Sequence, residues 1–191
     1  MISGIFSQDI EDYISNLGGG SLASIQSERD LSAVSQIVSG QFELGKMYTF
    51  RYITPDEKIY DMRPIILFLG YNDQNNLIGL NLHYFPLSPR IEIIKRIVRS
   101  YESSISVEVN SKRLSKADQQ RPLSSFTYEN LKMAFQQRLN ILHGVRQYRL
   151  DRITSPSVIG YESWYIGVAN DTDNFKGASM QFSQSLYYSN I

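Results

Sequence analysis

Two apolar runs separated by five polar residues constrain this chain more than any other feature. The first run, RPIILFLGY, covers residues 63–71, and the second, LIGLNLHYF, covers residues 77–85. Both runs are rich in β-branched and aromatic residues, and the NDQNN between them has the composition of a short turn. Within residues 63–86, prolines occur only near the start of the first run and directly after the second, where a missing N–H group does little harm. The sequence therefore predicts an antiparallel β-hairpin.

Asn81 and His83 are polar residues inside the second run. Residues two apart on a strand share one face, so both side chains are expected on the same side of the hairpin. The chain contains no GxSxG motif and no paired-histidine spacing that would give them a catalytic or metal-binding partner. We therefore interpret Asn81 and His83 as a structural pair. They are expected to hydrogen-bond adjacent backbone and to align the Pro86 turn into the following helix.

The remaining segments predict further strands and helices around this hairpin. KMYTFRYI, at residues 46–53, alternates in the manner of a strand. Ser88-Pro89 opens a helix, with proline in its first turn. The other predictions are a helix at 127–143 that stops at Gly144, and strands within 146–156 and 161–170.

This order of elements is typical of an α+β fold. We expect a small bent antiparallel sheet, or an SH3-like partial barrel, with two packed helices and a helical N-terminal arm. The predicted domain organisation is an arm at residues 1–43 and a core domain at residues 44–191 that ends in an interaction tail.

The arm has apolar residues at helical spacing, followed by three glycines at positions 18–20 that act as a hinge. A second helical pattern ends near Gly40. Short isolated helices are marginal in water, so both must bury their apolar sides. They pack either on this chain's own core or, as a detached arm, on another subunit.

The last twelve residues, MQFSQSLYYSNI, are apolar and aromatic but too few to form a domain, which favours burial at an interface. Together with the arm they supply the predicted subunit-interface residues: Ile5, Phe6, Ile10, Ile14, Phe182, Tyr187 and Tyr188.

The net charge of zero hides an uneven distribution. Residues 88–152 contain 13 Lys and Arg against 6 Asp and Glu, and the rest of the chain contains 6 against 13. Such a chain can present one basic side to a polyanion or to an acidic neighbour, or its charges are ordinary solvated surface. The candidate contacts to DNA phosphates or to a partner protein are Arg90, Lys95, Arg96, Arg99, Lys112, Arg113 and Lys116, with Tyr101, Tyr128 and Tyr148 as candidates for base stacking.

Composition excludes several kinds of site. With no cysteine, the chain has neither disulfides nor thiolate-ligated metals. The two histidines, His83 and His143, are isolated, and the chain has no phosphate-binding GxxxxGK[ST] motif. The carboxylates that could bind Mg²⁺ in a nuclease are Asp56, Glu57, Asp61, Asp73, Asp171 and Asp173, but loop carboxylates are common. We expect no metal, no cofactor and no enzymatic activity.

No secretory signal and no membrane-length apolar run is present, so we expect synthesis in a cytoplasm.

Three segments together resemble a protein family. They are GKMYTFRY, then YDMRPIILFLGYNDQNNLIGLNLHYFP with RIEIIKRI shortly after it, and ESWYIGVANDTDNFKGAS near the C-terminus. In order and spacing they resemble small virion proteins of tailed bacteriophages, especially large myoviruses of the T-even type. Members are often labelled DNA end protector or virion structural protein. The resemblance covers residues 45–180 and implies a structural component of the neck, tail, baseplate or packaged DNA end. It also implies location in the virion and other virion proteins as partners. The alternative is a sequence-independent DNA-end-binding protein or a metal-dependent nuclease.

Overall fold

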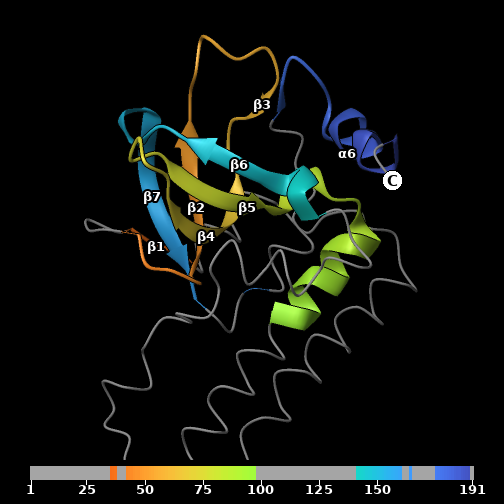
Figure 1. Cartoon of the computed structure of the whole chain (residues 1–191), viewed down its shortest axis with the longest axis horizontal. Coiled ribbons are helices and arrows are strands. Elements are labelled where there is room, and N and C mark those ends of the chain that lie inside the picture. Colours follow the sequence, from red (N-terminus) through yellow and green to blue (C-terminus); the bar gives the residue numbers. More distant parts are fainter. Residues whose placement is uncertain (1–34, 38–41, 98–140, 161–163, 165–174, 190–191) are drawn as a thin grey trace, which may run out of the picture.

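Figure 1 shows the computed structural model of the chain, which describes residues 35–37, 42–97, 141–160, 164 and 175–189. Within these residues, six strands form one sheet and two further strands form a second, smaller sheet. The described helices are at residues 87–97 and at Met180–Ser189 (α6). The predicted α+β fold is therefore confirmed.

The larger sheet contains the predicted hairpin. Its strands follow the spatial order β1 (Ser35–Ile37), β7 (Ile153–Ile159), β2 (Met47–Tyr52), β4 (Ile65–Tyr71), β5 (Leu77–Asn81) and β6 (Val145–Tyr148). Every neighbouring pair is antiparallel. The connection from β6 to β7 is short and includes the 3₁₀-helix η4 (Leu150–Arg152). The sheet is bent but open, because its two edge strands, β1 and β6, do not pair with each other (Figure 1).

Asn72 closes the turn between β4 and β5. Its side-chain oxygen accepts hydrogen bonds from the backbone N–H groups of Gln74 at 3.1 Å and Asn76 at 2.8 Å. Asparagine is favoured in turns because its side chain can take the place of a backbone acceptor in this way. Asn75 has a φ of 57°, a left-handed conformation that asparagine adopts more readily than most residues. The polar run NDQNN is therefore a turn for identifiable chemical reasons.

The smaller sheet attaches the C-terminal end of the chain to the loop after β2. β3 (Tyr60–Asp61) pairs with β8 (Phe175–Lys176), and α6 then contacts η1 (Leu82–Tyr84), the 3₁₀-helix after β5. At Gly177 φ is +80°, and a Cβ added there would lie 2.1 Å from the carbonyl oxygen of Lys58. Glycine permits both this backbone conformation and this close approach. We refer to β8 and α6 together as the C-terminal segment.

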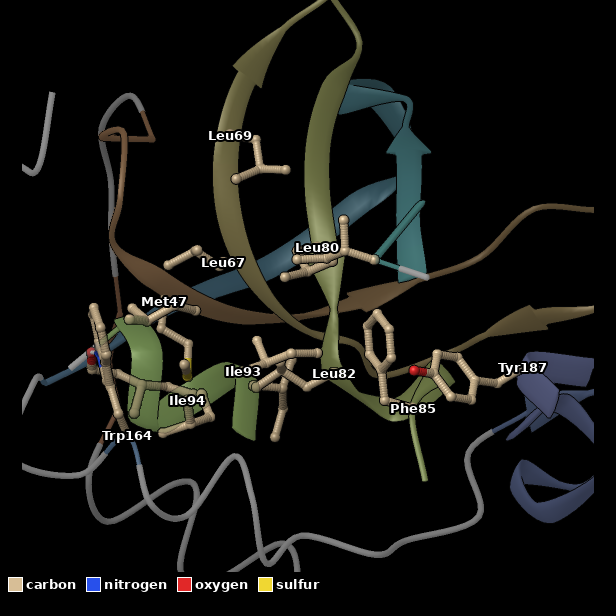
Figure 2. Packing of buried hydrophobic residues seen from close by; sticks show 14 residues of the cluster. Met47, Leu67, Leu69, Leu80, Leu82, Phe85, Ile93, Ile94, Trp164 and Tyr187 are labelled. Carbon is tan, nitrogen blue, oxygen red and sulfur yellow. Dashed lines mark hydrogen bonds between the residues drawn. The ribbon is translucent and has the colours of Figure 1, made fainter. Parts of the chain in front are cut away.

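Two clusters of buried side chains lie on opposite faces of the larger sheet. The aliphatic cluster joins the sheet to the helix at 87–97 and consists of Met47, Ile65, Leu67, Leu69, Leu80, Leu82, Phe85, Ile93, Ile94, Ile97, Ile141, Ile159, Trp164 and Tyr187 (Figure 2). The aromatic cluster consists of Tyr48, Phe50, Tyr52, Tyr60, Ile66, Phe68, Leu77 and Tyr148. Alternate residues of β2 and β4 enter different clusters, because successive side chains of a strand point to opposite faces. Each fully buried large apolar side chain contributes about 1.5–3 kcal/mol to stability.

Three local predictions differ from the structure. Residues 35–37, predicted as the end of a helix in the arm, form β1 and pair with β7. The strand predicted over 77–85 ends at Asn81, because the next three residues form η1. The predicted strand at 161–170 is described only at Trp164, whose backbone is helical.

Other predictions fall on residues outside the described part of the chain. These are residues 1–34 of the arm, residues 127–140 of the second predicted helix and the basic residues beyond 97 up to 140. Among the described residues, no helix combines the length and apolar character needed to cross a membrane.

Candidate functional site

Four buried polar side chains meet beside η1. Asn81 and His83 are 0% exposed, Asp61 is 1% exposed and Tyr148 is 4% exposed. Asparagine, histidine and especially aspartate are uncommon in protein interiors, where they require hydrogen-bond partners. We call these four residues the polar network and treat it as the candidate site.

Asn81 is the centre of the polar network. It ends β5 and caps η1, since its Oδ1 accepts a hydrogen bond from the backbone N–H of His83 at 2.9 Å. Its Nδ2 donates to Oδ2 of Asp61 at 3.0 Å and to the hydroxyl oxygen of Tyr148 at 3.0 Å. Both amide protons and the amide oxygen are therefore used. One side chain thus connects β3, β5, β6 and η1.

Asp61 fixes the ring of His83. Nδ1 of His83 lies 2.7 Å from Oδ2 of Asp61 and donates to it, because an ionised carboxylate can only accept. The other carboxylate oxygen, Oδ1, accepts from the backbone N–H of Arg63 at 2.9 Å. Nε2 of His83 has no hydrogen-bond partner among the described residues. The carboxylate therefore sets the orientation of the imidazole through one ring nitrogen.

Burial and charge shift two pKa values in the polar network. Burial raises the pKa of Asp61, but the charge of His83 and hydrogen bonds from His83, Asn81 and the Arg63 backbone outweigh it, so this pKa lies below its ordinary value. Burial, and then the charge of Asp61, raises the pKa of Tyr148 well above its ordinary value. The polar network therefore holds an ionised carboxylate beside a neutral phenol across the physiological range.

The arrangement suits a structural anchor better than a reaction centre. An aspartate that orients a histidine is also part of catalytic triads, but these require a nucleophile within hydrogen-bond reach and access for substrate. His83 is fully enclosed, and no described side chain bonds to its Nε2. A shallow depression of about 450 Å³ lies away from it and is lined by Gln74, Asn75, Asn76, Arg149, Leu150 and Asp151.

Asn81 hydrogen-bonds adjacent backbone as expected, through the N–H of His83. The ring of His83 instead bonds the Asp61 carboxylate, and His83 lies in η1 rather than on the strand. Two partners were missed. The sequence predicts Asp61 as one of several loop carboxylates and Tyr148 as a candidate for base stacking, but the burial of Tyr148 prevents such contact. No local signal marks Asp61, because Met62 separates it from the first apolar run and its partners are distant in the sequence.

The predicted DNA or partner contacts are only partly described. Arg90 must be corrected, because it is 1% exposed and directs its guanidinium inward, where Nε and Nη2 donate to the Phe85 carbonyl oxygen at 3.3 and 3.0 Å. Lys95 is half-buried, and Nε of Arg96 bonds to Oε1 of Glu92 at 2.6 Å. The candidates outside the described residues are Arg99, Lys112, Arg113 and Lys116.

The predicted subunit-interface residues in α6 separate into two sets. Tyr187 is 2% exposed, and its ring centroid lies 5.8 Å from that of Phe85, so it belongs to this chain's own core (Figure 2). This corrects its prediction as an interface residue. Phe182 is 51% exposed and remains a candidate. Tyr188 lies in α6, but its side chain is outside the described part, as are the arm residues Ile5, Phe6, Ile10 and Ile14.

The candidate metal-binding carboxylates that the structure describes do not form a cluster. Within the described residues, no group of three or more metal-ligating side chains occurs. Asp56 instead pairs with Arg152, with 2.8 Å between Oδ2 and Nη2, while Glu57 and Asp73 are exposed and Asp61 is in the polar network. Asp171 and Asp173 lie outside the described residues.

Comparisons with models of protein families, with curated proteins and with solved structures find no match to this chain. The resemblance to phage virion proteins therefore stays a prediction.

Proposed function

We propose that this chain is a non-enzymatic structural component of a tailed-phage virion. It acts through contacts with neighbouring subunits at the neck, tail or baseplate, or at the packaged DNA end. The observation that carries the proposal is the role of the resembling segments. Their most distinctive polar residues, Asp61, Asn81 and His83, hydrogen-bond one another in the interior.

The position of such residues, in a cleft or in the interior, separates a sequence pattern that serves catalysis from one that specifies the fold. Catalytic residues face a cleft that a substrate can enter, and they are often carried on surface loops. Residues that are fully enclosed and bonded to one another specify how elements pack instead. A pattern made of such residues is expected in a protein that functions through surface contacts with other subunits.

The proposed partners are other virion proteins in a symmetric assembly, in which one surface patch recurs around the axis. Several large apolar side chains on the described surface are available for such contacts. The most exposed are Ile53 and Phe182, each at 51%, and Leu142 at 46%. Single exposed apolar residues are ordinary, so these contribute only candidate positions.

The test is the location of the protein. Purified particles of the phage whose genome encodes this chain are separated into heads and tails, and each fraction is analysed by quantitative mass spectrometry. The expected result is a fixed copy number in one fraction, comparable with that of known structural proteins. A phage-encoded cytoplasmic enzyme serves as control and should be lost on washing. Detection of this chain in infected cells but not in particles would refute the proposal.

DNA binding is the outcome that would favour the alternative function. The purified chain is applied to heparin and to labelled linear DNA at increasing salt. Phosphate contacts would be indicated by retention that weakens steeply with salt. The double variant Arg96→Glu with Arg99→Glu should then lose this retention, and the control Arg149→Glu should keep it. We expect no such retention. Arg96 already pairs with Glu92, and Arg90 is buried.

The proposed arm has its own test. Full-length protein is compared with a variant that lacks residues 1–20, by light scattering and by the fluorescence of Trp164, which is the only tryptophan and belongs to the aliphatic cluster. We expect the shortened chain to keep its fluorescence and to associate less. A monomeric full-length chain whose shortened form unfolds would contradict the arm.

A further inference from the structure

The chain has two histidines, and both contact α6. The backbone carbonyl oxygen of His83 accepts a hydrogen bond from Nε2 of Gln184 at 3.2 Å. Nε2 of His143, in η3 (Ile141–Gly144), lies 3.3 Å from the carbonyl oxygen of Ser183. Both histidines of this chain therefore lie beside α6.

His143 has an environment that suits a neutral ring. Its ring centroid lies 6.1 Å from that of Tyr84, 6.3 Å from that of Phe85 and 5.8 Å from that of Tyr187. The guanidinium carbon of Arg146 lies 3.9 Å from the Tyr84 ring centroid, so a cation shares this aromatic surface. α6 carries no charged residue at all and offers no carboxylate to a protonated His143.

The charges around the C-terminal segment are mostly positive. Arg146 on β6 is next to Tyr84, and Nζ of Lys176 lies 5.5 Å from the Tyr60 ring centroid. The described carboxylates whose charge acts on this region are Asp61 and Glu57, both through Tyr84. Acidification therefore adds positive charge where Arg146 and Lys176 already lie, and it neutralises Asp61.

Asp61 and His83 join the two elements on which the C-terminal segment rests. Asp61 lies in β3, which pairs with β8, and His83 lies in η1, which contacts α6. Their 2.7 Å contact holds β3 against η1. Loss of this contact would separate the two halves of the surface that receives the C-terminal segment.

We propose that docking of the C-terminal segment is acid-sensitive, so that acidification releases β8 and α6 while the larger sheet stays folded. The first step is protonation of His143, and the second is protonation of Asp61. Between these two steps most residues of the aliphatic cluster stay packed, because the residue that α6 supplies to this cluster is Tyr187.

The direction follows from the pKa shifts. Burial lowers the pKa of His143, hydrogen bonds to the Ser183 and Tyr84 carbonyls oppose this, and Arg146 lowers it further, so the folded value lies below 6.5. The stability from neutral His143 is complete above pH 6.5 and is lost as pH falls through the lowered pKa. The pKa of Asp61 lies below 3.8, so its contribution is complete above that pH and is lost last.

Hydrogen exchange with mass spectrometry on the full chain tests the first step, at about pH 7.5 and about pH 5.5, either side of the ordinary histidine pKa. After correction for intrinsic exchange rates, we expect a severalfold loss of protection in peptides from residues 175–189. Peptides from β2, β4 and β5 should stay protected, and Trp164 emission should not change. His143→Gln keeps an N–H donor for Ser183 but cannot titrate, so its C-terminal peptides should be equally protected at both pH values.

Three results would overturn the proposal. The first is an equal loss of exchange protection in the C-terminal peptides of wild type and His143→Gln on acidification. The second is a loss of protection spread evenly over the larger sheet. The third is no loss of protection in the wild type. Because His143→Gln could fail to fold, proton NMR of the wild type gives a second measurement. The two imidazole Cε1–H signals are identified by their response to Arg146→Gln, which should raise the pKa of His143. A His143 signal that titrates at or above pH 6.5 would refute the first step.

Discussion

The aliphatic cluster and the polar network both fasten other elements to the larger sheet, but they do so by different physics. The aliphatic cluster is held by burial of apolar area, which has no preferred direction and tolerates changes of shape. In the polar network, each hydrogen bond joins two particular atoms, as between Asn81 and both Asp61 and Tyr148. Apolar packing therefore supplies much of the stability, whereas the polar network determines where β3, β6 and η1 meet. Substitutions that keep the volume of a side chain but change its charge or hydrogen bonding should separate the contributions of the aliphatic cluster and the polar network.

The largest effect is expected for Asp61→Asn. The change preserves volume but removes the charge opposite His83 and an acceptor for two N–H donors, so it leaves a buried polar group unsatisfied. Each unsatisfied buried polar group costs about 1–3 kcal/mol, and more where a charged group is involved, so the loss of an acceptor shared by His83 and Asn81 should exceed the loss of a single hydrogen bond. Urea unfolding followed by Trp164 fluorescence measures this loss. A loss below about 1 kcal/mol, the range of exposed ion pairs, would show that the polar network does not anchor the fold.

The same variant gives a pH test. Because the pKa of Asp61 is lowered by folding, ionised Asp61 stabilises the chain fully above its ordinary value of 3.8 and loses this effect as pH falls through the lowered pKa. The difference in unfolding free energy between wild type and Asp61→Asn should therefore be constant near neutral pH and shrink in acid. A difference that grows in acid would contradict the lowered pKa of Asp61.

A smaller loss is expected for Tyr148→Phe. It removes the hydroxyl that accepts from Nδ2 of Asn81 at 3.0 Å, while the ring stays in the aromatic cluster. One unsatisfied buried donor costs about 1–3 kcal/mol. Thermal or urea unfolding measures it, with Tyr71→Phe as the control, because Tyr71 is 39% exposed. Equal effects of the two variants would argue against the polar network.

Leu67→Met should cost less. Leu67 is 0% exposed in the aliphatic cluster, and a volume-conserving apolar exchange typically costs below about 1.5 kcal/mol. The comparison with Asp61→Asn is the informative one, since both changes are close in size. If Leu67→Met were the more damaging, precise apolar packing rather than the polar network would dominate this fold.

The smallest effect is expected for Asp151→Asn. Asp151 accepts two hydrogen bonds from Arg149 at 3.1 and 2.9 Å, but both side chains are exposed by more than half. Exposed ion pairs contribute little to stability, because solvent screens the charges and ordering two long side chains costs entropy. Urea unfolding should barely distinguish this variant from wild type. It is therefore the matched control for Asp61→Asn.

The hairpin and the first helix were predictable because their signals are local. The β-rich runs around NDQNN predict β4 and β5, and Ser88-Pro89 marks the helix at 87–97. What could not be predicted depends on contacts between distant parts of the chain. β3 is only two residues long and forms by pairing with β8, so nothing in its own sequence distinguishes it from a loop.

Only two of the four residues of the polar network were predictable, because only these two have a local signal in the sequence. Asn81 and His83 stand out because polar residues interrupt an apolar run. Their partners are 20 positions away at Asp61 and 67 positions away at Tyr148, and neither spacing has a regular period. The helical form of residues 180–189 was also missed. Its inward residues, Met180, Ser183 and Tyr187, have helical spacing, but aromatic residues lie on both sides.

The strand order has a consequence for synthesis on the ribosome. β2 lies between β4, which follows it closely in the chain, and β7, which is made after most of the chain. Until residues 153–159 emerge, the side of β2 that pairs with β7 has no partner from that strand. Contacts between distant segments must wait for loop closure, and sheets that depend on them fold slowly. This sheet can therefore be completed only late in translation, and the nascent hairpin must stay free of aggregation until then.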